Sequence, residues 1–215
     1  RRAYKMSLDY ISSEGYNRGL ANSHELNYIK EKKMLLDRLL PQSKEDKKAV
    51  VLAADFLNVD QVVTTMKSIC YHNRSVRFYI INKDFPKEWF IQLNSRLRDF
   101  DSEIINCRVT SKEISRYKTD ISYTVYLRYF VADFVKEDKA LYLDYDLVVT
   151  KNLDDLFNID LQDYPLAAIR DYGGKVYYGR EIFNAGVLLI NNRVWKQEQL
   201  PQRLIDLTNE WHDKV

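Results

Sequence analysis

Two aspartates, Asp144 and Asp146, have a spacing and a context that could support chemistry. They flank one tyrosine at the end of the apolar run ALYLD, residues 140–144. Two carboxylates at a strand end can converge on one hard divalent cation, and such a cation would neutralise a substrate diphosphate. Asp99 and Asp101 have the same spacing after a charged helical pattern, where it indicates an ordinary turn. The strand context therefore distinguishes Asp144 and Asp146.

Other polar residues follow predicted strands, where open α/β sheets bind their ligands. Asp55 follows a first apolar strand, and the segment 171–186 contains Asp171 and the sequence Asn184-Ala185-Gly186. Each has a simpler interpretation that stays open. Asp55 could cap the next helix, and residues 184–186 could form a strand entry or bulge without a ligand.

The glycine distribution excludes two common nucleotide-binding sites. Neither a G-x-G-x-x-G fingerprint nor a G-x-x-x-x-G-K-[ST] loop occurs. The chain has no glycine between Gly19 and Gly173, and its four later glycines lie at positions 173–186. We expect these glycines to allow close approach of the backbone to a ligand, or movement of a loop over it.

Apolar runs alternate with helical periodicity from residue 49 onward. This pattern predicts an α/β fold with a mostly parallel sheet flanked by helices. The predicted strands span residues 49–54, 76–82, 103–110, 140–144, 166–169 and 183–190, and the predicted helices span 59–70, 86–100, 123–135 and 194–211.

Residues 1–48 differ from the rest of the chain, and we expect them to form an N-terminal helical arm beside a domain at 49–215. The arm is more basic than the body, in a chain of net charge +2. Asn22 and Glu25 resemble an N-cap and its capping partner, and a leucine stripe follows until Pro41. We interpret this helix as a docking or linking element for a partner or a neighbouring module.

Five motifs in order resemble the family 8 retaining glycosyltransferases, and most closely the bacterial, streptococcal-type members. They are AAD at 53–55, Tyr126-x-Arg128, YLDYDLVV at 142–149, NLDDLF at 152–157 and FNAGVLLIN at 183–191. The resemblance covers residues 49–215. It implies a GT-A fold, in which a Rossmann-like sheet uses a D-x-D metal site, and transfer of a hexose from a UDP-sugar with retention.

The resemblance also implies roles for individual residues. Asp144 and Asp146 would bind Mn²⁺, with Mg²⁺ as the other candidate. Asp171 and Asn184 would be the catalytic residues, beside the donor sugar or the acceptor. The expected donor-binding residues are Ala53, Ala54, Asp55, Tyr126, Arg128, Asp144, Tyr145, Asp146, Asn184 and Ala185.

The expected activity is transfer of glucose or galactose from UDP-glucose or UDP-galactose to a hydroxyl of a glycan or glycoprotein. Front-face attack is the preferred mechanism, because no carboxylate stands out as a nucleophile. We expect a cytoplasmic protein with no transmembrane segment and no nucleic-acid partner. The family's later Gln-Asp and H-x-x-G-x-K-P-W-like segments, which would supply a third metal ligand, do not occur in these 215 residues. We therefore expect a C-terminally incomplete domain with weak activity at best.

Three alternatives remain. Asp144-x-Asp146-x-Val148 matches the nucleophile loop of haloacid-dehalogenase-type phosphatases, although three predicted strands precede it and that loop usually follows the first. A non-catalytic sugar-binding module would use the 16 tyrosines for stacking, but those at 123, 126 and 129 fit helix packing better. Arg128 could also be a surface ion pair of little consequence.

Overall fold

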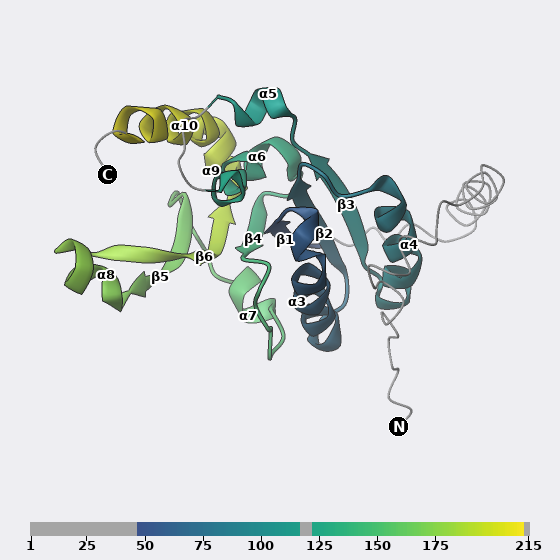
Figure 1. The fold of residues 1–215 in the computed structure, drawn as a ribbon. Coiled ribbons are helices and arrows are strands. Elements are labelled where there is room, and N and C mark those ends of the chain that lie inside the picture. The colour runs from purple at the N-terminus through teal and green to yellow at the C-terminus, as the bar shows by residue number, and fades with distance from the viewer. Residues whose placement is uncertain (1–46, 117–121, 213–215) are drawn as a thin grey trace. The chain divides into compact units, whose positions relative to one another are not determined.

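The computed structural model describes residues 47–116 and 122–212 (Figure 1). The predicted helical arm at 1–48 falls almost wholly outside these residues. Its organisation therefore stays a prediction. Among the described residues, no helix combines the length and apolar character that crossing a bilayer requires.

A six-stranded sheet in the order β3-β2-β1-β4-β6-β5 organises the described residues. Its strands are β1 (Lys48–Ala53), β2 (Val76–Asn82), β3 (Glu103–Arg108), β4 (Lys139–Leu143), β5 (Leu166–Asp171) and β6 (Ile182–Asn191). The pairs from β3 to β4 are parallel, whereas β6 runs antiparallel to both β4 and β5. The predicted α/β fold with a mostly parallel sheet is therefore confirmed, and β6 is the strand that reverses.

Right-handed crossovers explain how the helices cover the sheet. Helix α3 (Val59–His72) joins β1 to β2, and α4 (Lys87–Leu97) joins β2 to β3. Both connections step in the same direction along the sheet, so a right-handed chain places both helices on one face. The chain then returns past β1 to reach β4, which places the intervening elements on the other face (Figure 1).

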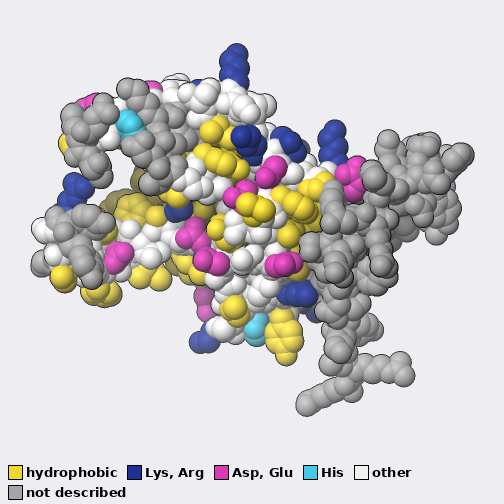
Figure 2. Space-filling view, viewed as in Figure 1, with side chains coloured by type: hydrophobic (Ala, Val, Ile, Leu, Met, Phe, Trp, Pro, Cys, Tyr) yellow, Lys and Arg dark blue, Asp and Glu magenta, His cyan; other side chains and the backbone are white. Residues whose placement is uncertain are grey.

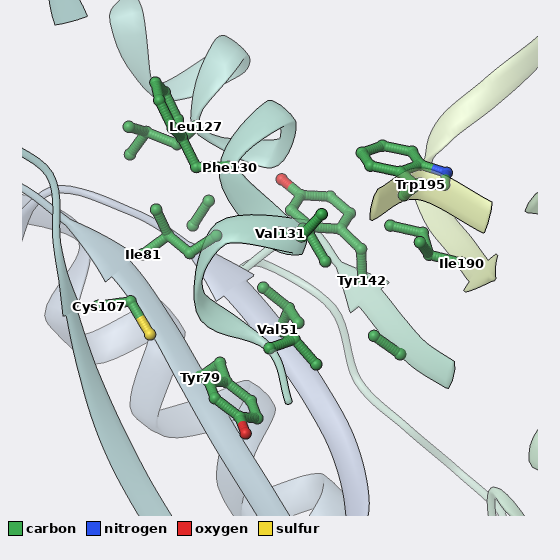
Figure 3. Packing of buried hydrophobic residues seen from close by; sticks show 14 of the residues in the cluster. Val51, Tyr79, Ile81, Cys107, Leu127, Phe130, Val131, Tyr142, Ile190 and Trp195 are labelled. Carbon is green, nitrogen blue, oxygen red and sulfur yellow. The ribbon is translucent and has the colours of Figure 1, made fainter. Parts of the chain in front are cut away.

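Alternate residues of the central strands pack under this second layer. The layer consists of the 3₁₀ helix η4 (Tyr123–Phe130) with α6 (Val131–Phe134), α9 (Asn192–Gln197) and α10 (Leu200–Trp211). Figure 3 shows Val51, Tyr79 and Tyr142 of the sheet in one buried cluster with Val131 and Trp195 of the helices. Both faces of β1 are covered, which is why its sequence is an unbroken apolar run.

Two predicted helices differ from the structure. Residues 123–135 form η4 followed by the single turn α6, rather than one α-helix. Residues 194–211 are divided between α9 and α10, with Gln199 in the left-handed region at φ 51°. Pro201 has no N–H to donate to the preceding turn, so the chain must restart its helix there.

The remaining elements are short. They are η2 (Phe56–Asn58), η3 (Arg98–Phe100), α5 (Ser111–Ile114), α7 (Asp154–Phe157) and α8 (Tyr172–Tyr178). Of these, α7 corresponds to the NLDDLF motif. Helix α8 was not predicted, because two glycines lie in its first turn. Gly174 packs so closely against Ile182 of β6 that a Cβ would collide with that side chain. This glycine therefore serves packing rather than a ligand.

The two cysteines should be unreactive towards thiol reagents in the folded protein. Cys70 and Cys107 are buried free thiols, and burial raises the pKa of each to about 12. Because the thiolate is the reactive form, we expect no labelling by Ellman's reagent at pH 8 until guanidinium unfolds the chain. Fast labelling of either thiol in the native protein would contradict this packing.

Candidate functional site

The candidate site lies where the strand order of the sheet reverses. Strands β1 and β4 are parallel neighbours, with Leu52 paired to Leu143. Their carboxyl ends therefore meet, although some 90 residues of sequence separate them. Asp55 follows the first strand and Asp144 the second. Ligands of open α/β sheets bind in the crevice at this kind of reversal.

Arg128 joins three separate pieces of this site. It projects from η4 with its side chain 15% exposed, and its Nη2 lies 3.4 Å from Asp144 Oδ1. Its Nη1 donates to the Ala185 carbonyl at 2.5 Å, and its Nε donates to the Val125 carbonyl at 2.8 Å. The guanidinium also lies over the ring of Tyr142. Arg128 therefore does form an ion pair, but one that is largely buried on the arginine side and accompanied by two bonds to main-chain carbonyls.

Tyr142 supplies a second donor to the same carboxylate oxygen. Side chains two apart on a strand share a face, so Tyr142 and Asp144 both point towards the layer that contains η4. The Tyr142 hydroxyl donates to Asp144 Oδ1 at 3.1 Å. Burial raises the pKa of this tyrosine well above its usual value, so the proton needed for this bond stays in place. Oδ1 of Asp144 is thus held from two sides.

The other oxygen of Asp144 faces an interrupted stretch of β6. Pairing with β5 jumps from Leu188 to Asn184, and the Gly186 carbonyl instead accepts the Asp144 N–H at 2.8 Å. A Cβ at Gly186 would lie 2.7 Å from Asp144 Oδ2. Asn184 Oδ1 accepts the Gly186 N–H at 2.8 Å. Residues 184–186 therefore lie at an irregularity in the β5–β6 pairing, as the bulge interpretation expected, and this irregularity lies against the candidate site. Its contact with a ligand stays a prediction.

Carboxylates concentrate around Tyr145. Burial raises the pKa of the Tyr145 hydroxyl, and three nearby carboxylates raise it further, those of Asp146, Asp55 and Asp144. Hard oxygen donors of this kind suit Mn²⁺ or Mg²⁺, so Asp144 and Asp146 fit such a cation by their chemistry. Among the described residues, no group of three or more His, Cys, Asp and Glu side chains could hold a metal. Asp144 and Asp146 stay the predicted metal ligands.

Two of the predicted donor-binding residues, Ala53 and Ala54, have small side chains and could contact a ligand mainly through their main chain. Ala53 and Ala54 are 2% and 0% exposed, and the Ala54 N–H donates to the Ile81 carbonyl. Asp55 is half-buried and accepts a hydrogen bond from Asn58 Nδ2 at 2.5 Å, without a capping bond to the following helix. Tyr126 packs against the core cluster. Their contacts with a donor stay predictions.

Asp171 has a local structural role. Its Oδ1 accepts the N–H groups of Gly173 and Gly174 at 2.9 Å and 3.3 Å, so it caps the first turn of α8. Asp171 and Asn184 lie at the ends of neighbouring strands, and the pair Asp171–Ile182 is in register. The catalytic roles predicted for both residues are neither supported nor contradicted by these contacts.

Tyr142 is the residue of this site that sequence analysis missed. Its signal was present, because a tyrosine inside a buried strand usually needs a partner for its hydroxyl. An aspartate two positions later on the same face is such a partner. The sequence did not show that Arg128 would approach the same oxygen, since this depends on the path of η4.

An apolar cavity of about 510 Å³ adjoins the polar site and shares Arg128 and Ala185 with it. Its other walls come from β5, β6, α9 and α10, and include Leu166, Phe183 and Trp195. Figure 2 shows apolar side chains in the hollow between α10 and the β5–β6 pair, and acidic side chains on the middle of the face, where β4 and β6 lie in Figure 1. The site therefore has a charged part and an apolar part.

Comparison with known proteins identifies the family. The model of glycosyl transferase family 8 matches residues 27–214, nearly the whole chain. The chain belongs to glycosyl transferase family 8. This membership confirms the resemblance drawn from the five motifs, and the phosphatase alternative is left without support.

Relatives of this family occur among streptococcal glycosyltransferases. Glycosyltransferase GlyA of Streptococcus pneumoniae serotype 4 is 65% identical over 212 residues, which are 99% of this chain and 30% of GlyA. The probable glycosyl transferase Gly of Streptococcus gordonii is 53% identical over 171 residues, 80% of this chain and 25% of that protein. The chain thus spans less than a third of the length of these two relatives.

Solved structures confirm the GT-A fold. The crystal structure of glycosyltransferase GlyE from Streptococcus pneumoniae TIGR4 has a TM-score of 0.68 and 43% identity, over 80% of this chain and 41% of GlyE. The galactosyltransferase LgtC, solved in complex with donor and acceptor sugar analogues, has a TM-score of 0.62 and 26% identity. That likeness covers 75% of this chain and 65% of LgtC.

The contact between Gly186 and Asp144 can be tested by a double-mutant cycle. Gly186→Ala should lower the free energy of unfolding by about 1–3 kcal/mol, because the new Cβ must displace a carboxylate that Arg128 and Tyr142 hold. In an Asp144→Ala background the same change should cost less, because the obstructing oxygen is gone. Urea denaturation of the four proteins measures the coupling.

Gly179→Ala is the matched control for this cycle. Gly179 has φ 67°, and no atom lies within 4 Å of the position that a Cβ would take there. Its cost therefore comes from the backbone alone and should be equal in both backgrounds. An equal cost of Gly186→Ala in both backgrounds would contradict the contact.

Proposed function

We propose that the protein transfers glucose or galactose from a UDP-sugar to a hydroxyl of a glycan or glycoprotein, with retention at the transferred carbon. A divalent cation, Mn²⁺ or Mg²⁺, bound by Asp144 and Asp146 supports the departure of UDP. Family membership supports glycosyl transfer. The donor, the metal and the acceptor are our proposals. Cytoplasm stays the predicted location, where the donor pool is expected.

The observation that carries the proposal is the meeting of carboxylates at the reversal of the sheet. Asp55 and Asp144 follow the paired strands β1 and β4 and Asp146 lies two residues further on, and all three carboxylates raise the pKa of the Tyr145 hydroxyl. Such a concentration of negative charge would repel a diphosphate. A bound divalent cation would neutralise the leaving diphosphate as its charge develops. Carboxylates beside a phosphate-binding crevice are consistent with metal-dependent chemistry for this reason.

The chain's own residues would orient the donor. Arg128 uses one N–H on each of its three nitrogens to hold the site together, and a guanidinium has further donors for a ligand oxygen. Asn184 is exposed and its amide nitrogen can donate to a sugar hydroxyl. Together Arg128 and Asn184 provide donors on the β6 side of the site.

Retention favours front-face attack over a covalent intermediate. Each of the two candidate carboxylates is fixed at one oxygen to its own surroundings, Asp171 Oδ1 by two main-chain N–H groups and Asp144 Oδ1 by Arg128 and Tyr142. No carboxylate among the described site residues therefore stands out as a nucleophile, and we propose front-face attack for this reason.

A binding and turnover experiment tests the proposal. Calorimetry with UDP and Mn²⁺, and an assay of UDP release from UDP-glucose and UDP-galactose, would be applied to the wild-type protein and Asp146→Asn. We expect Mn²⁺-dependent UDP binding that Asp146→Asn weakens at least about tenfold, since a metal ligand is lost. Asp99→Asn is the matched control, because Asp99 begins an identical D-x-D spacing on the exposed turn after α4.

Three results would contradict the proposal. UDP binding that is unaffected by Asp146→Asn, or by removal of the metal with EDTA, would exclude the metal site. Hydrolysis of p-nitrophenyl phosphate without any release of UDP would favour the phosphatase alternative. Binding of free sugars without UDP binding would favour a non-catalytic module.

Arg128→Lys should weaken UDP binding by about tenfold, corresponding to about 1.4 kcal/mol. A lysine cannot reproduce the three directed bonds of the guanidinium. Arg74→Lys is the control, because Arg74 also bonds two carbonyls and stacks on an aromatic ring, Phe100, but contacts α3 rather than the site. Equal affinity of the wild type and Arg128→Lys, measured by calorimetry, would contradict this role.

A further inference from the structure

The segment that contains Asp146 lies along helix α3 and is fastened to it by side chains. Residues 144–153 form neither helix nor strand, so their main-chain N–H groups need other partners. Ser68 Oγ accepts the Val149 N–H at 2.9 Å, and Asn73 Oδ1 accepts the Leu153 N–H at 2.9 Å. A third side chain, Thr65, fastens the beginning of the segment.

Thr65 contacts the main chain on both sides of Asp146. Its hydroxyl oxygen lies 2.6 Å from the Tyr145 carbonyl and 2.8 Å from the Leu147 carbonyl, to either of which it can donate. It also accepts the Leu147 N–H at 3.1 Å. Thr65 is completely buried. Water therefore cannot replace these bonds without opening the contact between α3 and the segment.

The two aspartates differ in how their carboxylates are placed. Asp144 is held through its own side chain by Arg128 and Tyr142. Asp146 is exposed, and within residues 47–116 and 122–212 nothing donates a hydrogen bond to its carboxylate. The position of the Asp146 side chain is therefore set by its backbone, and Thr65 is the residue that fixes this backbone.

We infer that Thr65 is a positioning residue for the divalent cation, acting through the main chain of Asp146. This inference rests on the proposed function, because it takes Asp144 and Asp146 as the metal ligands. The hydroxyl of Thr65 fixes the main chain on both sides of Asp146, and would thereby present the Asp146 carboxylate to an ion held by Asp144. Outer groups that orient a ligand typically change metal affinity about 10–100-fold when they are removed.

Mn²⁺ binding to the chain alone, measured by calorimetry without a sugar donor, tests the inference. Thr65→Val keeps the shape of the side chain but removes the hydroxyl, and should raise the dissociation constant for Mn²⁺ about tenfold. Thr65→Ser keeps the hydroxyl and should restore affinity. Hydrogen exchange should show faster exchange of the Leu147 amide in Thr65→Val only.

Asn94→Ala is the control for a loss of stability alone. The Asn94 side chain also fastens a helix to main chain, because it bonds the N–H and the carbonyl of Ile104 at 2.8 Å and 2.9 Å. It has no contact with residues 144–153 among these bonds. Asn94→Ala should lower the unfolding temperature as Thr65→Val does, and leave Mn²⁺ affinity unchanged.

Three results would overturn the inference. These are equal losses of Mn²⁺ affinity in Thr65→Val and Asn94→Ala, unchanged affinity in Thr65→Val despite faster Leu147 exchange, and failure of Thr65→Ser to restore binding. A failure of the proposed function looks different. In that case the wild type binds no Mn²⁺, or Asp146→Asn binds it as well as the wild type, and the inference falls with the metal site.

Discussion

The parallel pairing of β1 with β4 is the contact on which the candidate site depends. These strands lie at the point where the strand order reverses, so the connections that follow them leave in opposite directions along the sheet. Asp55 and Asp144 meet in the space that remains. Arg128, Asn184 and Ala185 reach this space from the neighbouring elements η4 and β6. A change in the register of the pair would separate the two carboxylates by moving one strand along the other.

Strand pairing alone places only the main chain, and η4 completes the arrangement. Arg128 projects from this 3₁₀ helix onto the β4 carboxylate and the β6 bulge at once. Because the same layer carries Leu127 and Phe130 into the core, packing of the interior and placement of the guanidinium are coupled. Loss of core packing under η4 would therefore displace the Arg128 guanidinium, even if every residue that contacts a ligand were unchanged.

Much of this arrangement could be predicted from the sequence because the central strands β1, β2 and β4 are buried on both faces. An unbroken apolar run such as residues 49–54 has few other structural interpretations, and all six strands were found near their predicted bounds. The direction of β6 was not predictable in this way, since a buried run looks alike in either orientation. The division of the last helix at Gln199 was missed, although Pro201 was a local signal for it.

The site residues likewise include some that the sequence could predict and some that it could not. Asp144 and Asp146 were recognisable because a motif preserves their spacing along the chain. Tyr142 had a local signal that was missed, an aspartate two positions later on the same face, whereas Thr65 had none because only the fold brings its partners near. Thr65 lies among apolar residues of α3 and resembles a tolerated core threonine. Its partners are 80 residues away in the sequence, and no local pattern joins them.

The unequal restraint of the two aspartates has a consequence for ion selectivity. In the proposed metal site, Asp144 is fixed at one oxygen, whereas the Asp146 side chain can turn about its own bonds from an anchored backbone. Selectivity by ionic radius requires ligands that cannot follow the ion. A pair with one fixed and one adjustable carboxylate can close around ions of different size. Such a pair would select cations by charge and hardness more than by radius, and the prevailing ion in the surroundings would then decide which one it holds.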